Sequence, residues 1–140
     1  MKFLLDTNVI TELAKPQPHP HVTEWVDKHS AMDLAISALT LGELTRSVRS
    51  YASPTRREEL SKWIADDLPR QFRGRLYDMD EAVVTEWGKL AADSKLQGRE
   101  LPVIDGLLLA TAKVHGLTFV TRNESDCAAR GVDALNPWVR

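Results

Sequence analysis

The sequence predicts an α/β fold in which a mostly parallel β-sheet is flanked by helices on both faces. Short apolar runs typical of buried strands alternate with longer amphipathic segments typical of helices. Several of the apolar runs end directly in Asp or in another polar side chain. The 140 residues, 43% of them hydrophobic, suffice for one core, so residues 1–140 are expected to form a single domain.

In the first half of the chain, apolar runs indicate two strands, Lys2–Leu5 and Leu34–Ser37. Between them, the helical composition of Asn8–Ala14 stops at the proline-rich stretch Pro16–Pro20, which is typical of a loop. The segment His21–His29 is expected to be a helix, because its apolar residues fall on one face.

The rest of the chain carries the same alternation, together with helix boundary signals such as Pro near a start and Gly after an end. The expected elements, in order, are a helix from Thr40 onward, a helix over Pro54–Leu68, a weak strand at Arg75–Tyr77, a helix between Asp80 and Gly98, a helix from Pro102 to His115, and strands at Thr118–Thr121 and Val132–Leu135. No internal repeat or linker interrupts this order.

Charge and cysteine content restrict the functional class. The net charge is −2, which does not indicate nucleic-acid or membrane binding by the surface as a whole. Between Arg46 and Arg75, however, eight Lys or Arg face four Asp or Glu, a local +4, so the remainder carries −6. Cys127 is the single cysteine, which excludes an intrachain disulfide. The N-terminal apolar run is too short for a signal peptide, so a cytoplasmic location is expected.

Acidic side chains lie where strands end or helices begin, at Asp6, Glu43, Asp105 and the stretch Asn123–Asp126. In an open parallel sheet these strand ends meet in one crevice. Two carboxylates about 5 Å apart repel by roughly 3 kcal/mol at an effective dielectric of about 20, unless a cation lies between them. The pattern therefore predicts a divalent-metal site.

Each acid also has a purely structural explanation. Asp6 could simply cap a helix, and Glu43 could complete a capping box with Thr40. Asp105 could interact with a helix dipole, and Asp126 could cap a short helix. Because Asp105 is three and four residues before two large leucines, it is expected to share their apolar face, where a carboxylate needs a compensating charge.

The ligand chemistry favours Mg²⁺ or Mn²⁺, because the donors are hard oxygens without His or Cys at zinc-binding spacing. Other enzyme classes fit less well. A phosphotransfer domain with an aspartyl nucleophile requires a second Asp two residues after the first, where this chain has Asn8. A nucleotide-binding module requires a glycine-rich phosphate loop, and neither common form is present.

Four ordered motifs, with the C-terminal Asn136–Trp138, resemble the PIN domain, and more closely the VapC/FitB-type toxin ribonucleases. These motifs are Leu4–Ile10, Ser37–Leu44, Asp105–Ala112 and Val120–Asn123. The resemblance covers nearly the whole chain. It implies a Mg²⁺- or Mn²⁺-dependent endoribonuclease that acts as the toxin of a type II toxin–antitoxin pair.

The resemblance also implies roles for single residues. The catalytic acids of the family map onto Asp6, Glu43 and Asp105; Asp6 and Asp105 would bind the metal directly, and Glu43 would act through a water or orient it. The fourth acidic position is open between Asn123 and Asp126, and Cys127 stands where relatives carry an aromatic residue. The supporting side chains proposed around these acids are Asn8, Thr121, Asn123 and Asp126.

The expected partners follow from the same resemblance: an RNA substrate, a VapB-type antitoxin, a second copy of the chain in a homodimer, and operator DNA only through the antitoxin, with no membrane contact. Arg46, Arg49 and Arg122 are the candidate RNA contacts. Three tryptophans on predicted helices, Trp25, Trp63 and Trp87, could form an interface or belong to the core. The alternative function is a catalytically weak PIN-like module that acts mainly by binding its antitoxin and the antitoxin–DNA complex.

Overall fold

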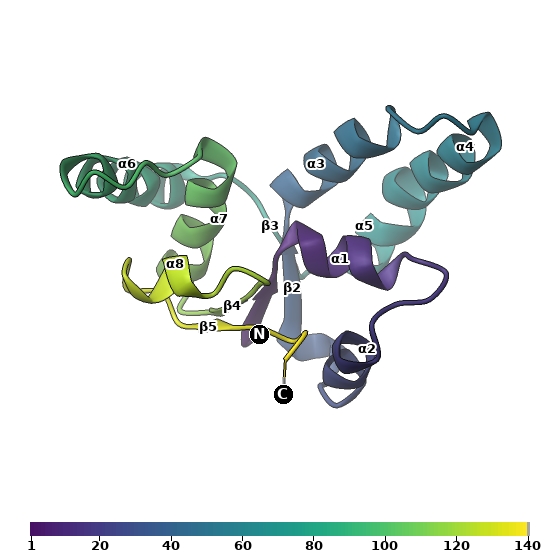
Figure 1. Ribbon diagram of the computed structural model, residues 1–140, viewed down its shortest axis with the longest axis horizontal. Coiled ribbons are helices and arrows are strands. Elements are labelled where there is room, and N and C mark those ends of the chain that lie inside the picture. Colours follow the sequence, from purple (N-terminus) through teal and green to yellow (C-terminus); the bar gives the residue numbers. More distant parts are fainter. Residues whose placement is uncertain (140) are drawn as a thin grey trace.

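A computed structural model describes residues 1–139, in which five parallel strands form one sheet in the order β3-β2-β1-β4-β5 (Figure 1). The strands are β1 (Phe3–Leu5), β2 (Leu34–Ser37), β3 (Leu76–Tyr77), β4 (Thr118–Val120) and β5 (Ala134–Leu135). The α/β prediction is confirmed, and in the described residues the sheet is entirely parallel. All five strands were expected near these positions.

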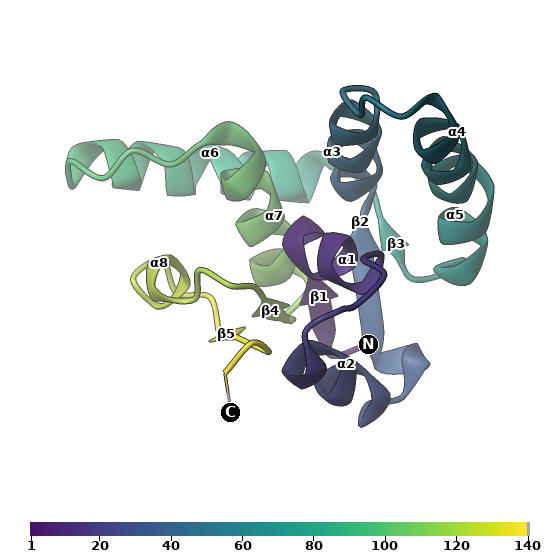
Figure 2. The ribbon, with the colours of Figure 1, turned by 45° about the vertical axis from the view of Figure 1, so that its right-hand side comes forward.

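The helices connect successive strands, as parallel pairing requires. They are α1 (Thr7–Leu13), α2 (Pro20–Asp27), α3 (Ala38–Val48), α4 (Pro54–Lys62), α5 (Leu68–Gln71), α6 (Glu81–Leu96), α7 (Val103–Val114) and α8 (Ser125–Ala128), with a 3₁₀ turn η1 (Ala31–Asp33) and a π-helical segment η2 (Trp63–Asp67). In both ribbon views, α6 and α7 lie on the opposite side of the sheet from α3, α4 and α5 (Figures 1 and 2).

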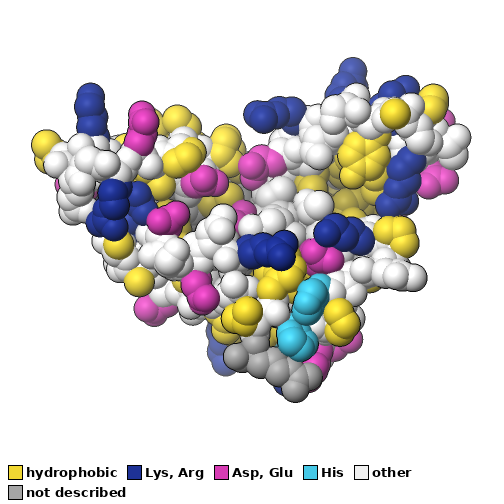
Figure 3. Space-filling model, in the orientation of Figure 1, with side chains coloured by type: hydrophobic (Ala, Val, Ile, Leu, Met, Phe, Trp, Pro, Cys, Tyr) yellow, Lys and Arg dark blue, Asp and Glu magenta, His cyan; other side chains and the backbone are white. Residues whose placement is uncertain are grey.

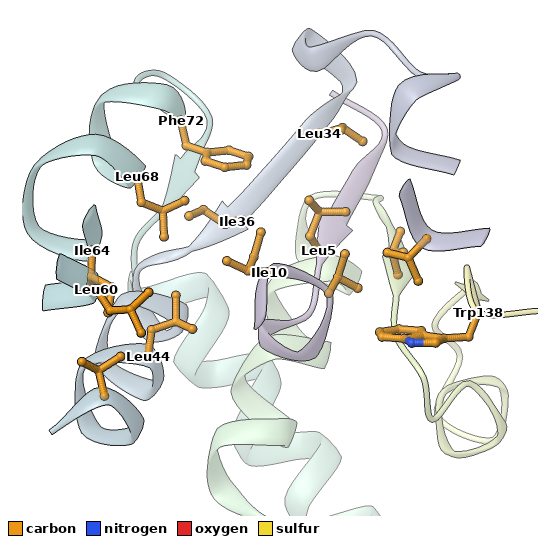
Figure 4. Close-up of a cluster of buried hydrophobic side chains, with 14 residues drawn as sticks. Leu5, Ile10, Leu34, Ile36, Leu44, Leu60, Ile64, Leu68, Phe72 and Trp138 are labelled. Carbon is orange, nitrogen blue, oxygen red and sulfur yellow. The ribbon is translucent and has the colours of Figure 1, made fainter. Parts of the chain in front are cut away.

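Alternation along the strands divides the core into two clusters. Leu5 of β1 packs into the cluster formed with α1 to α5, whereas the preceding Leu4 packs against α6, α7 and α8. Figure 4 shows the first cluster, in which side chains from the strands and the surrounding helices point toward one another and Trp138 lies at one end. Because both faces are covered, the strands are mostly apolar, with Ser37 and Thr118 only at strand ends.

Two helix predictions are wrong in their boundaries. The predicted helix from Thr40 begins at Ala38, because Ser37 at the end of β2 supplies the cap, its Oγ accepting from Leu39 N at 3.1 Å. Glu43 is therefore the sixth residue of α3 and not the third, so the capping box proposed for Thr40 and Glu43 does not form.

The predicted helix Pro54–Leu68 is interrupted. It runs as α4 to Lys62, continues through η2 and resumes as α5, which contains Pro69. Proline has no N–H and its ring collides with the carbonyl four residues earlier, so a regular helix is disrupted just before it. A π-helical turn accommodates this local defect. The short η1 was not predicted as a helix, and Asp126 does not cap α8 but lies in its first turn.

Trp25 on α2, Trp63 on η2 and Trp87 on α6 are partly buried and pack against the core clusters. This packing agrees with a core role for much of their surface, and the homodimer stays a prediction. None of the described helices combines the length and apolarity needed to cross a membrane.

Close contact between α6 and α7 depends on Gly106. A Cβ atom at this position would lie 2.8 Å from Trp87 Cδ1 and 3.0 Å from Leu101 Cδ2. This contact sets the position of the first turn of α7, which carries Asp105.

We predict that Gly106→Ala lowers the free energy of unfolding by about 1–3 kcal/mol, because the added methyl group overpacks this contact. Gly88→Ala is the matched control, since Gly88 is an exposed residue of α6 with open space at its Cβ position. The control should instead raise stability by up to about 1 kcal/mol through helix propensity. Equal effects of the two substitutions in urea denaturation would contradict this account.

Candidate functional site

The site forms where β1 and β4 lie side by side, at the point where the strand order of the sheet reverses. Ligands of open parallel sheets bind in the crevice at such a point, beyond the carboxyl ends of the strands. Asp6 follows β1 there, and its N–H donates to Val120 O of β4 at 2.9 Å. The site therefore begins with two neighbouring strand ends.

The carboxylate of Asp6 is fixed by two donors. Thr7 N–H donates to Oδ1 at 2.7 Å, and Thr121 Oγ1 donates to Oδ2 at 2.8 Å. Asp6 is thus the cap of α1, as its structural explanation proposed. Capping leaves acceptor sites on the carboxylate free, since each oxygen can accept a further hydrogen bond or bind a cation.

Glu43 reaches the same site from α3. Thr7 Oγ1 donates to Glu43 Oε1 at 2.5 Å and lies 3.1 Å from Thr40 Oγ1. Thr40 is fully buried, whereas Glu43 is half-buried. Thr7 consequently connects the cap of α1 to the glutamate of α3.

Asp105 lies in the first turn of α7 and is exposed, which corrects the expectation that it shares the buried face of Leu108 and Leu109. Those two leucines are buried as expected. The first turn of α7 borders the crevice. Asp105 lies on the same helical face as the two leucines, but at this end of the helix that face is open to solvent.

Two adjoining hollows share the acids. One, of about 440 Å³, is lined by Asp6, Asn8, Glu43, Asp105 and Asn123 among others. The other, of about 190 Å³, is lined by Asp6, Asp105, Thr121, Asn123 and Asp126 among others. Figure 3 shows this side of the molecule hollowed between the two groups of helices, with acidic side chains along the hollow and Lys and Arg to either side.

The charges of the acids oppose one another. Burial raises the pKa of Asp6, the hydrogen bonds from Thr121 and Thr7 lower it, and the charges of Asp105 and Glu43 raise it further; the net shift is upward. The pKa of Asp105 is raised first by partial desolvation at the edge of the crevice and then by the charge of Asp126. Both carboxylates are therefore harder to ionise than free aspartate, which a nearby cation would reverse.

The fourth acidic position stays open after the fold is known. Asn123 lines both hollows, whereas Asp126 lines the smaller one and acts on Asp105 through its charge. Cys127 is buried, and burial raises the pKa of its thiol to about 11, so it stays protonated at neutral pH.

Arg122 lines the larger hollow, as its predicted RNA-binding role requires. Arg46 near the end of α3 and Arg49, which caps it, are exposed, and neither lines the two hollows described above. Their proposed contact with RNA would lie outside the crevice.

The sequence analysis missed five charged residues of the crevice: Glu12, Lys15, Arg99, Glu100 and Arg130. Glu12 is buried and accepts from Lys15 Nζ and His19 N, each at 3.0 Å. Helical spacing could have revealed Glu12, which lies four residues after Asn8 on α1. Arg99 and Arg130 have no comparable local signal.

The donors present fit a hard divalent cation. Among residues 1–139, no three Asp, Glu, His or Cys side chains form a ready-made metal cage. Mg²⁺ does not need one, because it keeps several waters and uses one or two carboxylates. Asn8 Oδ1 is buried without a hydrogen-bond partner in the described part of the chain. This oxygen lies in the same hollow as the acids and is a further possible ligand for a cation.

Fold and site together define a parallel α/β domain with an acidic crevice at its strand ends. The chain belongs to the PIN domain family, whose model matches residues 3–130. The family resemblance noted in the sequence is thereby confirmed.

Known proteins extend this assignment. The chain is 35% identical to toxin FitB of Neisseria gonorrhoeae, over 97% of this chain and 98% of the relative. It is 33% identical to VapC ribonuclease Y4jK of Sinorhizobium fredii, over 97% of both chains. The solved structure of FitAB bound to an IR36 DNA fragment matches with a TM-score of 0.90 and 33% identity, covering 99% of this chain and 96% of the other.

We predict that Asp105→Asn leaves the protein as stable as the wild type at pH 7 in EDTA, or more stable by up to about 0.5 kcal/mol, since solvent screens this exposed charge. The raised pKa values mean that the folded state binds protons more tightly than the unfolded state. The ionised carboxylates destabilise the folded state fully at a pH above their raised pKa values. This destabilisation disappears as the pH falls through the folded-state pKa values toward those of the unfolded chain, so wild type and Asp105→Asn should become equally stable there.

Urea denaturation across this pH range tests the prediction, with Asp133→Asn, an exposed acid before β5, as the control. Destabilisation by Asp105→Asn of more than about 1 kcal/mol would instead show that Asp105 stabilises the fold.

Proposed function

We propose that this protein is a Mg²⁺- or Mn²⁺-dependent endoribonuclease and the toxin of a type II toxin–antitoxin pair. The observation that carries the proposal is the convergence of Asp6, Glu43 and Asp105, from three separate elements, on one crevice. The ribonuclease name of a relative that matches over 97% of both chains supports RNA as the substrate.

In this proposal, Asp6 and Asp105 hold the metal, and Glu43 orients the attacking water or accepts its proton. When bound, the cation lowers the pKa of a water and neutralises charge on the phosphate. Thr121 and Thr7 fix the Asp6 carboxylate and the Glu43 carboxylate, so these groups need little reorganisation. No nucleophilic side chain is required, which agrees with the buried, protonated Cys127.

We predict that the protein cleaves a labelled RNA pool in Mg²⁺ or Mn²⁺ and not in excess EDTA. Asp6→Asn should reduce the rate at least about a hundredfold, because a lost metal contact forfeits several kcal/mol of transition-state stabilisation. Thr121→Val should cost about 10–100-fold by releasing the Asp6 carboxylate.

Asp133→Asn serves again as the charge-matched control and should cleave at the wild-type rate. Melting curves must show that all variants are folded. Undiminished cleavage in EDTA, or by the Asp6→Asn variant, would refute metal-dependent cleavage at this site.

We also propose that a small VapB-type antitoxin restrains the enzyme, which acts as a homodimer and reaches operator DNA only through that antitoxin. Solved proteins of the same fold include toxin–antitoxin complexes. An antitoxin Arg could occupy the acidic crevice, because a guanidinium binds carboxylates bidentately.

We predict that expression of the protein alone arrests growth and that Asp6→Asn abolishes the arrest. Co-expression of the small reading frame beside its own should restore growth. Sedimentation should give a dimer. A monomer that is harmless without any partner would count against this part of the proposal.

A further inference from the structure

Each of the two hollows that share Asp6 and Asp105 has basic side chains in the part of its lining that the other hollow lacks, and we call these parts the basic ends. The larger one is lined by Lys15 and Arg122, and the smaller one by Arg99 and Arg130. Asp6 and Asp105 line both, so they lie between the two basic ends. A nucleic-acid strand that passed the acids would meet cations before and after them.

Arg130 is held in place by neighbours. Its Nε donates to Ser94 Oγ at 3.0 Å, Nη1 to Asp126 O at 2.8 Å and Nη2 to Arg99 O at 3.5 Å. Ser94 is buried on α6, and Arg130 is half-buried. A guanidinium has five N–H groups, so the two that these bonds leave over can bind a phosphate.

At the opposite end, Arg122 is held by an aromatic ring and a backbone hydrogen bond. Its Cζ lies 5.1 Å from the ring centre of Trp138, and its carbonyl accepts from Asn136 Nδ2 at 3.2 Å. Trp138 is buried, and its Nε1 donates to Glu12 Oε1 at 3.4 Å. The C-terminal segment thus provides a fixed aromatic platform beneath an exposed guanidinium.

The basic segment Arg46–Arg75 offers less than its charge suggests. Arg75 is buried and donates to the carbonyls of η1, β2 and α5, at Ala31, Leu34 and Gln71. Arg57 donates to Tyr51 O at 2.8 Å, and Arg56 is close to Glu59. Part of this excess therefore serves the fold.

We propose that single-stranded RNA crosses the acidic site between two phosphate-binding ends, Arg122 on its Trp138 platform and Arg130 with Arg99, and not along α3. The proposal rests on the proposed ribonuclease function and adds the path of its substrate. Lys15 is left out because its ammonium is already paired with Glu12 at 3.0 Å.

Fluorescence anisotropy with a short fluorescein-labelled single-stranded RNA, in EDTA to prevent cleavage, tests the path. Arg122→Ala and the double variant Arg99→Ala/Arg130→Ala should each weaken binding about tenfold or more. The slope of log K against log salt should fall by about 0.7 for each lost phosphate contact. Arg46→Ala/Arg49→Ala tests the rival path, since it removes two exposed arginines at the C-terminal end of α3 that the sequence suggested as RNA contacts; under our proposal it should bind as the wild type does.

Because Arg130 also anchors α8, Arg99→Ala alone and Ser94→Ala provide variants that keep the Arg130 charge. Ser94→Ala should weaken binding less than loss of Arg130 does, at an unchanged salt slope. If Arg46→Ala/Arg49→Ala weakens binding and the crevice variants do not, the path along α3 replaces ours.

A second experiment separates the two ends. Once the wild-type enzyme shows where it cuts, the RNA is shortened on one side of that bond. With the RNA shortened on one side, Arg122→Ala should no longer slow cleavage, whereas Arg99→Ala/Arg130→Ala still should. With the RNA shortened on the other side, Arg99→Ala/Arg130→Ala should no longer slow cleavage, whereas Arg122→Ala still should. Sensitivity of both variants to the same truncation would overturn the proposal. Absence of any cleavage by the wild type would refute the ribonuclease function instead, and the binding result would still decide the path.

Discussion

The carboxylate of Asp6 is held at the junction of β1 and β4, and the arrangement of the crevice follows from that attachment. Burial disfavours its charge, while Thr7 and Thr121 favour it through hydrogen bonds. Two donors occupy part of an acceptor that has about four lone-pair sites. The fold therefore keeps an incompletely satisfied carboxylate at the point where the strand order reverses, and the charges of Asp105 and Glu43 act on it from other elements. A cation is the group that would remove this conflict at lowest cost.

Much of the fold could be predicted from sequence, because it depends on local patterns. The strands are short and mostly apolar on both faces. Helix starts carry recognisable caps, such as Asp80, whose side chain accepts from Val83 N at 3.0 Å at the start of α6. The errors arise where two local signals compete. Ser37 and Thr40 can both cap a helix, and only the end of β2 decides for Ser37. A regular helix was expected over Pro54–Leu68, but a π-helical segment precedes Pro69 and the chain continues as a helix to Gln71.

The positions of Asp6 and Asp105 were predictable for the same reason, since Asp6 follows a strand and Asp105 lies in the first turn of a helix. Their neighbours were not. Glu12 contacts Trp138, and Arg130 contacts Ser94, across long stretches of chain, so no window of sequence contains both partners. Exposure was also misjudged: Asp105 shares the helical register of buried leucines but lies in the first turn of α7 at the crevice. Periodicity gives the face of a helix, and only packing shows where along that face the core ends.

Charge counting along the sequence misleads for a related physical reason. The excess between Arg46 and Arg75 includes a buried arginine that satisfies backbone carbonyls, so its charge is not available to a ligand. The crevice, by contrast, has an acidic floor that repels phosphate and basic ends that attract it. In the proposed function, these opposing fields would make RNA binding and metal binding interdependent, because a cation on the acids would remove the repulsion and a phosphate beside it would add a ligand of the kind Mg²⁺ prefers. By linkage each would then strengthen the binding of the other, which is how a chain with a net charge of −2 would hold a polyanion at this one place.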